Sequence, residues 1–360
     1  MSDVYAQPTT GAEPDTSHRL AHYTTLRLGG PAGRVVTART ADELVRAVRE
    51  ITGPVLVLAG GSNVVVGDDG FPGTVVLVRS RGLRVVDEDA DTVTVRVEAG
   101  EPWDELVART VANGWSGLEC LSGIPGSTGA TPIQNVGAYG QEVAETITGV
   151  RVYDRVTGAT EQIAAADCGF AYRSSIFKYH DRRVVLSVDF RLARSPLSGP
   201  VRYAELARAL DVEVGDRVPL ADARAAVLRL RAGKGMVLDA ADPDTWSVGS
   251  FFTNPVLDQA GYALLRERAA GIGEPPAWPG AGDVVKVSAA WLIDKAGFGK
   301  GHPGPEGVAI STKHTLALTN RSGTASTAAL VALAREIRDG VQSRFAVTLH
   351  PEPVLINCTI

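Results

Sequence analysis

The low cysteine content, the lack of metal-ligand spacing and the lack of long apolar runs each exclude a class of protein. The chain has only three cysteines, Cys120, Cys168 and Cys358, in 360 residues. This odd, widely spaced set argues against a disulfide framework and favours a reducing cytoplasm. No cysteine or histidine pair has the spacing of metal ligands, so the sequence predicts no metal site. It also lacks an apolar run of 18 residues, which predicts no membrane insertion.

The chain also lacks a strong excess of one charge. Its net charge is −5 and its pI is about 5.8. This balance argues against nucleic acid or an anionic membrane as the main partner, and any anionic ligand must be met by local positive groups. Residues 1–17 are polar, with neither the basic nor the apolar region of a signal peptide. We therefore expect a disordered arm over residues 1–18.

Glycine, in contrast, is concentrated in two stretches. One is Ala59–Asn63, and the other is residues 123–140, which hold five glycines in eighteen residues against 39 in the whole chain, roughly 2.5 times the average. Closely spaced glycines let backbone N–H groups turn toward an anion. Both stretches look like cradles for the diphosphate of one large cofactor, although each alone could be an ordinary turn.

A dinucleotide fold of the Rossmann type does not fit the first stretch. That fold needs G-x-G-x-x-G opening a helix directly after a strand. Here the predicted strand 55–58 leads through the glycines into Val64–Val66, a run that favours extended structure. The sequence therefore predicts a phosphate site built from loops.

The rest of the chain predicts a mixed α+β fold with many short strands and no regular βαβ alternation. A capping box over residues 40–43 predicts a helix whose apolar positions Leu44, Val48 and Ile51 share one face. The other predicted strands cover or include residues 74–78, 83–86, 93–97, 150–156 and 184–192. One further predicted helix begins at residue 104. The other predicted helices lie near residues 220–232, 257–270, 291–293 and 330–341. Domain boundaries are expected near 75, 236 and 345.

Three local groups could do chemistry. Residues 172–178 (YRSSIFK) place Arg173 beside hydroxyls, 249–255 (GSFFTNP) hold Ser250 on an apolar support, and 350–353 (HPEP) pin Glu352 between prolines. Position 252 is phenylalanine, so the second group is not a G-x-S-x-G nucleophile elbow. His314 lies in no recognisable motif and is expected to be structural or solvent-facing. The set suits protonating an enolate while a bound cofactor supplies the redox step.

From about Leu20 to Cys358, the sequence resembles the UDP-N-acetylenolpyruvoylglucosamine reductase family, flavoenzymes of peptidoglycan precursor synthesis. The resemblance rests on seven motifs in the family's order: YTTLRLGG at 23–30, GGSN at 60–63, IPGSTGATPIQNVGAYG at 124–140, YRSSIFK at 172–178, GSFFTNP at 249–255, AWLID at 290–294 and HPEP at 350–353. It implies an FAD-binding fold of the vanillyl-alcohol-oxidase (PCMH) type with subdomains 19–75 and 76–236, an α/β substrate domain 237–345, and a tail 346–360 that returns to the active site.

The resemblance also implies the ligands and their contacts. Non-covalent FAD would meet both glycine loops, at Gly60, Gly61, Ser62, Asn63, Pro125, Gly126, Ser127, Gly129, Gln134, Asn135 and Gly137. NADPH would reduce FAD and leave, and the enolpyruvyl nucleotide sugar would enter the same pocket. Ser250 would be the proton donor at C2, and Arg173 and Glu352 would polarise the substrate carboxylate. The sugar nucleotide would contact Tyr139, Tyr203, Lys234 and Asn254.

Two rival interpretations remain open. A flavin oxidase of the same superfamily could attach its flavin through Cys120, just before the second loop. A nucleotide-sugar binder without chemistry is less compatible with Arg173, Ser250 and Glu352 occurring together. Under the family interpretation we expect a cytoplasmic monomer or weak dimer. The segment Ile272–Ala281, rich in proline and glycine, matches no family motif.

Overall fold

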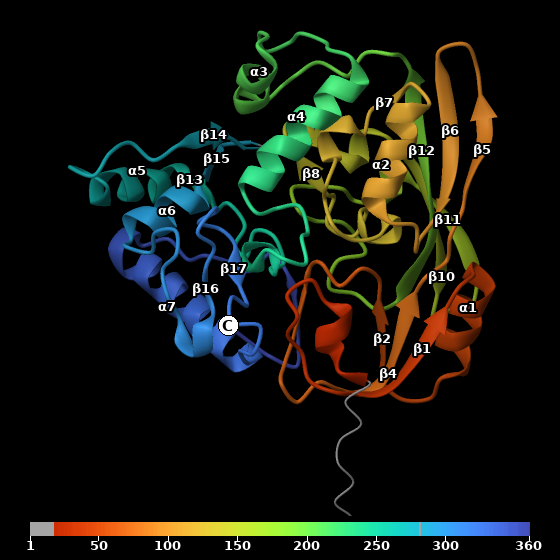
Figure 1. Cartoon of the computed structure of the whole chain (residues 1–360), viewed down its shortest axis with the longest axis horizontal. Helices are drawn as coiled ribbons and strands as arrows, with labels where there is room; N and C mark the ends of the chain where they lie inside the picture. The colour runs from red at the N-terminus through yellow and green to blue at the C-terminus, as the bar shows by residue number, and fades with distance from the viewer. Residues whose placement is uncertain (1–17, 281) are drawn as a thin grey trace, which may run out of the picture.

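The computed structural model describes residues 18–280 and 282–360, so the predicted arm lies outside the described residues except for His18. The chain forms three lobes (Figure 1). The N-terminal sheet and the larger second sheet lie on one side of the view, and the C-terminal helices lie on the other. The chain is mixed α and β throughout, as the sequence predicts.

The first lobe is a three-stranded parallel sheet in the order β1-β4-β2, covered by one helix. Its elements are β1 Ala32–Ala38, α1 Ala41–Glu50, β2 Val55–Leu58 and β4 Phe71–Val78. Thr40 caps α1 by accepting from the Glu43 backbone N–H, but the Glu43 carboxylate accepts from the N–H of Arg39, so the predicted reciprocal box is only half formed. The predicted boundary at residue 75 falls inside β4.

The second lobe is an antiparallel sheet in the order β11-β10-β12-β6-β5, with β7 paired to β12. Val93, Val95 and Val97 of β6 are fully buried and alternate with partly exposed residues, as the sequence predicts. The prediction for Val156 is wrong: it follows the end of β10 in a turn and is 75% exposed. The strands are β5 Leu83–Glu88, β6 Thr92–Glu98, β7 Trp115–Ser116, β10 Ile147–Asp154, β11 Thr160–Ala164 and β12 Arg183–Arg194.

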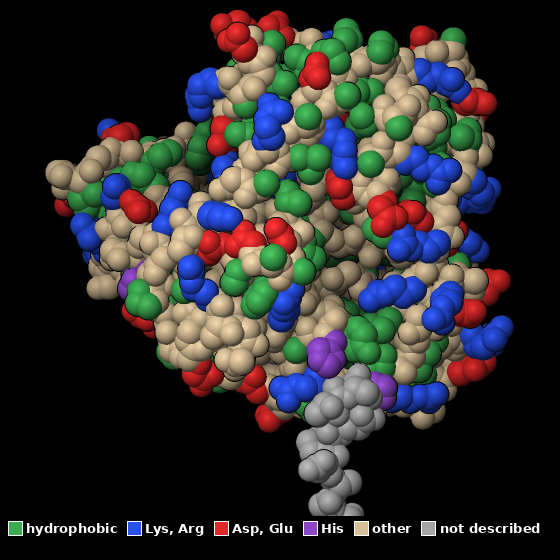
Figure 2. Space-filling model, viewed as in Figure 1, with side chains coloured by type: hydrophobic (Ala, Val, Ile, Leu, Met, Phe, Trp, Pro, Cys, Tyr) green, Lys and Arg blue, Asp and Glu red, His purple; other side chains and the backbone are tan. Residues whose placement is uncertain are grey.

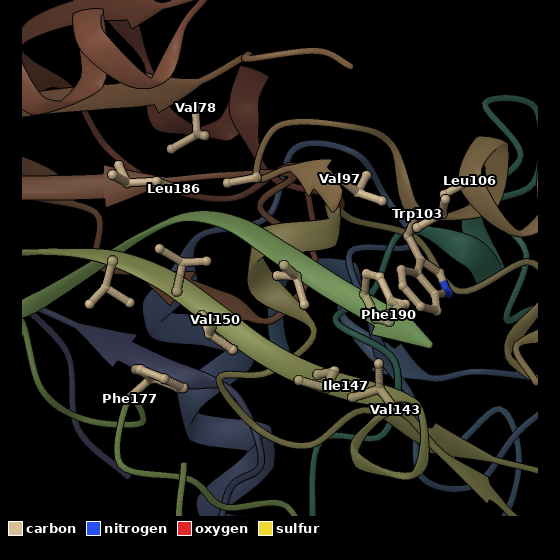
Figure 3. Close-up of a cluster of buried hydrophobic side chains, with 14 of the residues drawn as sticks. Val78, Val97, Trp103, Leu106, Val143, Ile147, Val150, Phe177, Leu186 and Phe190 are labelled. Atoms are coloured by element: carbon tan, nitrogen blue, oxygen red, sulfur yellow. The ribbon is translucent and has the colours of Figure 1, made fainter. Parts of the chain in front are cut away.

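The core of these two lobes is continuous. Trp103, at the start of α2, packs against Phe190 of β12 with ring centroids 6.0 Å apart, and Leu106 lies beside them (Figure 3). A smaller cluster under α3 and α4 includes Cys120 and Leu206. The remaining elements of this region are α2 Trp103–Ala112, β8 Gly137–Ala138, β9 Gln141–Glu142, α3 Ala204–Leu210 and α4 Leu220–Gly233.

The third lobe packs three helices against short strands, with the long helix α7 at its centre. Its elements are β13 Val256–Asp258, α5 Gln259–Arg268, β14 Ala277–Pro279, β15 Val284–Val287, α6 Ala289–Lys295, β16 Ala309–Ile310, β17 Leu318–Thr319 and α7 Thr327–Phe345. Leu257, predicted at the start of a helix, lies in β13 instead. The segment that matched no motif supplies β14, which pairs with β15.

The C-terminal segment crosses back to the first lobe. There β18 (Val354–Ile356) pairs in parallel with β3 (Val64–Val66). On the way, the Glu352 N–H donates to the Phe251 carbonyl at 2.8 Å, and the Thr253 N–H donates to the His350 carbonyl at 3.1 Å. The segment that carries Glu352 is therefore fixed to both the first and the third lobes.

Candidate active site

A cleft of about 860 Å³ runs between the lobes. Its walls come from the first glycine loop, the second glycine loop, the strand end at Val184–Val185, the segment 245–250 and the tail. This volume falls within the usual range for a ligand pocket.

The two glycine loops touch each other backbone to backbone. A Cβ added to Gly60 would lie 2.6 Å from the Cα of Gly126, and one added to Gly126 would lie 2.7 Å from Ser62 Oγ. Ser62 Oγ also donates to the Pro125 carbonyl at 2.8 Å. The first loop joins β2 to β3 without an α-helix, as the sequence predicts. The glycines are required here because any side chain would separate the loops.

A chain of polar side chains continues from the loops to the tail. Asn63 Nδ2 donates to Gln134 Oε1 at 2.6 Å, and Gln134 Nε2 lies 3.5 Å from Glu352 Oε1. Val354 N–H donates to the Asn63 carbonyl at 3.0 Å. All three polar side chains line the cleft, so both loops are connected to the tail carboxylate.

Arg173 and Glu352 form an ion pair on the cleft wall, with Nε and Oε1 3.2 Å apart. The guanidinium also donates to the backbone carbonyls of Asn135 at 3.2 Å and Gly137 at 2.8 Å. Arg173 has a left-handed backbone, φ +53°, an uncommon conformation for a residue with a side chain. Burial raises the pKa of Glu352 above its ordinary value, although Arg173 and Lys178 act in the opposite direction.

Ser250 lines the same cleft, directly after Gly249, which has φ +75°. Behind it, Phe251 and Phe252 are buried and pack edge to face at 5.1 Å. Because Phe251 is hydrogen-bonded to Glu352, Ser250 and Glu352 lie on adjoining backbone segments. The structure thus brings Ser250, Arg173 and Glu352 into one cleft, although 179 residues (352 − 173) separate the last two.

Another part of the cleft wall is aromatic and basic. Tyr139 and Tyr203 meet edge to face at 5.6 Å, and the Lys234 ammonium lies 5.6 Å from the Tyr139 ring centroid. Lys234 Nζ is 2.5 Å from Glu205 Oε2. Burial raises the pKa of Tyr139 to about 12, so its hydroxyl is protonated at neutral pH. This wall offers hydrogen-bond donors and positive charge, which suit a phosphorylated ligand.

Two further residues of this wall have no assigned role in the sequence prediction. Arg231 is held by the Met236 carbonyl at 2.8 Å, and burial lowers its pKa to about 10. His314, expected to be structural or solvent-facing, lines the cleft instead. Its pKa is lowered to about 4, first by burial and then by nearby cations that include Lys234. His314 Nδ1 accepts from the Leu316 N–H at 3.4 Å, which assigns the proton of the neutral ring to Nε2.

Three sequence-predicted residues lie off the cleft wall. Asn135 is buried and donates its amide to Glu142 and to the Ala171 carbonyl. Asn254 accepts from the N–H of Ala289 and so holds the start of α6. Cys120 is buried in the α3–α4 cluster, and burial raises its pKa to about 12. A buried, protonated thiol outside the cleft is poorly placed for the flavin attachment that the oxidase interpretation requires.

The remaining predicted residues all line the cleft: Gly60, Gly61, Ser62, Asn63, Pro125, Gly126, Ser127, Gly129, Gln134 and Gly137 on the loops, and Tyr139, Tyr203 and Lys234 opposite them. Two buried nitrogens on the wall also call for a ligand. Within residues 18–280 and 282–360, Arg183 Nε and Arg231 Nε have no hydrogen-bond partner. A contiguous glycine cradle lined by these two arginine side chains, each with one Nε that lacks a partner among the described residues, fits a large anionic dinucleotide such as FAD together with a phosphorylated substrate.

These features define a flavin-binding oxidoreductase with a separate substrate lobe. Residues 32–163 match the model of the FAD binding domain, and residues 242–356 match that of the UDP-N-acetylenolpyruvoylglucosamine reductase C-terminal domain. The chain belongs to the UDP-N-acetylenolpyruvoylglucosamine reductase family. The predicted fold class and family are therefore confirmed.

Curated relatives of this family align over almost the whole chain. The reductase of Salinispora arenicola is 80% identical over 100% of both chains, and that of Thermobifida fusca is 58% identical over 95% of this chain and 97% of its own. The solved structure of the reductase from Thermus caldophilus superposes with a TM-score of 0.65 at 26% identity, covering 94% of this chain and 97% of that chain.

Among the described residues, no helix is both long and apolar enough to cross a membrane. Acidic and basic side chains are interspersed over the face shown in Figure 2.

Proposed function

We propose that this enzyme reduces UDP-N-acetyl-3-O-(1-carboxyvinyl)-glucosamine to UDP-N-acetylmuramate with NADPH as the reductant. It acts in the cytoplasm, as a monomer or weak dimer, in the synthesis of the peptidoglycan precursors on which cell shape and division depend. The observation that carries this proposal is the convergence of Ser250, Arg173 and Glu352 on one cleft that also contains the glycine cradle.

The glycine loops hold the cofactor. Gly60 and Gly126 are the residues whose backbone would meet its diphosphate, while Ser62 and Asn63 fix the loops to each other and to Gln134. FAD held in this cradle would supply the redox chemistry, the transfer of hydride from NADPH to C3 of the enolpyruvyl double bond. The residues of this chain bind, orient and protonate the substrate.

Arg173 and Glu352 act on the substrate carboxylate. Negative charge that develops at C2 must spread into that carboxylate, and a guanidinium offers it parallel N–H donors. Arg173 is already oriented by two backbone carbonyls and by Glu352, so little reorganisation is needed when the charge appears. Glu352 holds the guanidinium in this orientation through its 3.2 Å ion pair with Nε of Arg173.

Ser250 supplies the proton to C2. An alcohol is a weak acid, so it must lie within hydrogen-bond reach of the carbanion carbon in a site closed to water. Phe251 and Phe252 form a rigid apolar support behind it. The nucleotide diphosphate is met by Lys234, Arg231 and Tyr203, and His314 offers a neutral Nε2–H donor beside them.

Anaerobic half-reactions test the role of Ser250. In Ser250→Ala, flavin reduction by NADPH keeps its wild-type rate, and flavin reoxidation by the enolpyruvyl substrate falls roughly 10²- to 10⁴-fold, the usual contribution of a general acid. Ser250→Cys is the matched control because a thiol keeps a proton donor in a similar volume. Equal slowing of both half-reactions in Ser250→Ala would show that Ser250 does not donate the proton.

A further inference from the structure

Lys178 lies behind the Arg173–Glu352 pair and holds both residues by their backbones. Its ammonium donates to the Arg173 carbonyl at 3.1 Å and lies 3.4 Å from the Glu352 carbonyl. The residue is only 7% exposed and is absent from the cleft wall. Lys178 therefore connects its own segment, which includes Arg173, to Glu352, which lies 174 residues further along the chain than Lys178.

Both segments need such a connection. Arg173 adopts an uncommon left-handed backbone, which persists only where surrounding contacts fix it. Glu352 is anchored on its N–H side by Phe251, and Lys178 meets its carbonyl on the other side. The ammonium thus fixes the positions from which the two side chains reach each other at 3.2 Å.

The charge of Lys178 is also unusual. Among the residues that the structure describes, no carboxylate forms an ion pair with its ammonium within 4.0 Å, and burial lowers its pKa. A buried cation that donates hydrogen bonds only to carbonyls, with the Tyr179 ring centroid 5.1 Å away, is costly to keep, and an apolar side chain would fill the space at lower cost. Arg173, Lys178 and Glu352 together carry a net charge of +1 when all are ionised, which suits a substrate carboxylate and the charge that develops on it.

We propose that Lys178 is a positioning residue for the second half-reaction: it fixes Arg173 and Glu352 relative to each other and keeps the carboxylate site positive. This inference rests on the roles proposed above for those two residues. Lys178 does not reach the cleft, so it acts through them and not on the substrate.

Neutral variants separate this role from a merely structural one. In Lys178→Met and Lys178→Gln, anaerobic flavin reduction by NADPH stays at its wild-type rate, and reoxidation by the enolpyruvyl substrate falls roughly 100-fold, as expected for misplacement by about 1 Å. If Lys178→Met does not fold or does not bind FAD, the reoxidation rate of Lys178→Gln tests the inference instead. Lys178→Arg restores most of the rate, and Lys295→Met, on the exposed side of α6, has no effect.

A pH profile supplies the signature that a structural role would not give. The charged and titratable groups around Glu352 are Arg173, Lys178, Tyr172 and Tyr179. The charge of Lys178 lowers the pKa of Glu352, so loss of that charge raises the pKa. In both neutral variants, the part of the reoxidation pH profile that reflects ionisation of Glu352 therefore moves to higher pH. In Lys178→Arg it stays in place.

The outcomes are distinguishable. Wild-type reoxidation in both neutral variants, or equal loss of both half-reactions with an unmoved pH limb, overturns the inference. Glu352→Gln is measured in parallel. If it reoxidises normally, the roles proposed for the pair fail; if it is impaired while the Lys178 variants are not, only the inference about Lys178 fails.

Discussion

Replacing Gly60 with alanine tests whether the two glycine loops form one cofactor cradle. The new Cβ would lie 2.6 Å from the Cα of Gly126, 3.0 Å from its carbonyl carbon and 3.3 Å from the backbone nitrogen of Ser127. All three atoms belong to backbone, so no flexible side chain can move aside. The only relief is for the loops to separate.

The size of the effect follows from that overlap. Carbon atoms in contact normally lie about 3.5 Å apart, so the loops must separate by about 0.9 Å. Overpacking of this kind costs about 1–3 kcal/mol. The apoprotein can relax by opening the loops, whereas the FAD complex needs them closed, so the strain weakens binding. Since each 1.4 kcal/mol is tenfold, the dissociation constant of FAD should rise roughly 5- to 150-fold.

The assay is titration of the apoprotein with FAD, followed by flavin fluorescence, with the bound flavin of the purified protein measured by absorbance. Gly233→Ala is the matched control: Gly233 ends α4, an added Cβ would meet no atom within 4 Å, and the change should leave FAD affinity unaltered. If Gly60→Ala binds FAD as tightly as the unmodified protein, contact between the loops does not govern the cradle.

Two further predictions concern the polar residues of the cleft. His314 has a folded pKa of about 4 against an ordinary 6.5, so its neutral form contributes fully to the free energy of unfolding above pH 6.5, and this contribution of about 3 kcal/mol at most is lost as the pH falls toward 4. In His314→Gln, the denaturant midpoint of the apoprotein should depend less on pH between 6.5 and 4. A pH dependence equal to that of the unmodified protein would contradict the assignment of a buried, neutral His314. Arg173→Lys keeps the positive charge, but a lysine cannot contact Asn135, Gly137 and Glu352 at the same time. Flavin reoxidation by the substrate should therefore slow about 10- to 100-fold, while flavin reduction by NADPH keeps its rate. A near-normal reoxidation rate would show that the positive charge alone is sufficient.

Local patterns in the sequence predict much of the fold. The valines of β6 alternate in sequence and in burial, and Leu44 and Val48 of α1 are buried together as their spacing predicts. The predictions of a strand at Val156 and of a helix at Leu257 are wrong. An apolar residue near the end of a hydrophobic pattern does not show where the strand or helix ends and the neighbouring turn begins. In the structure Val156 follows a turn around Asp154, and Leu257 pairs in β13.

The arrangement of the active site could be predicted from the sequence less fully than the fold. Motifs identified Arg173, Ser250 and Glu352, but their proximity depends on the return of the tail, which no local pattern encodes. His314 was missed because a lone histidine has no spacing to mark it, and only the packed structure shows that it faces the cleft. Asn254, by contrast, belongs to a motif yet is used to hold α6.

The parallel pairing of β18 with β3 has a consequence for how the enzyme becomes competent. The first 345 residues contain both glycine loops and the cleft residues Tyr139, Tyr203 and Lys234, but Glu352 and β18 are translated afterwards. A polypeptide that ends before residue 350 lacks Glu352, the strand that pairs with β3 and the Val354 N–H that donates to the Asn63 carbonyl of the first glycine loop. Loss of these few C-terminal residues would therefore impair the cofactor cradle as well as the carboxylate site.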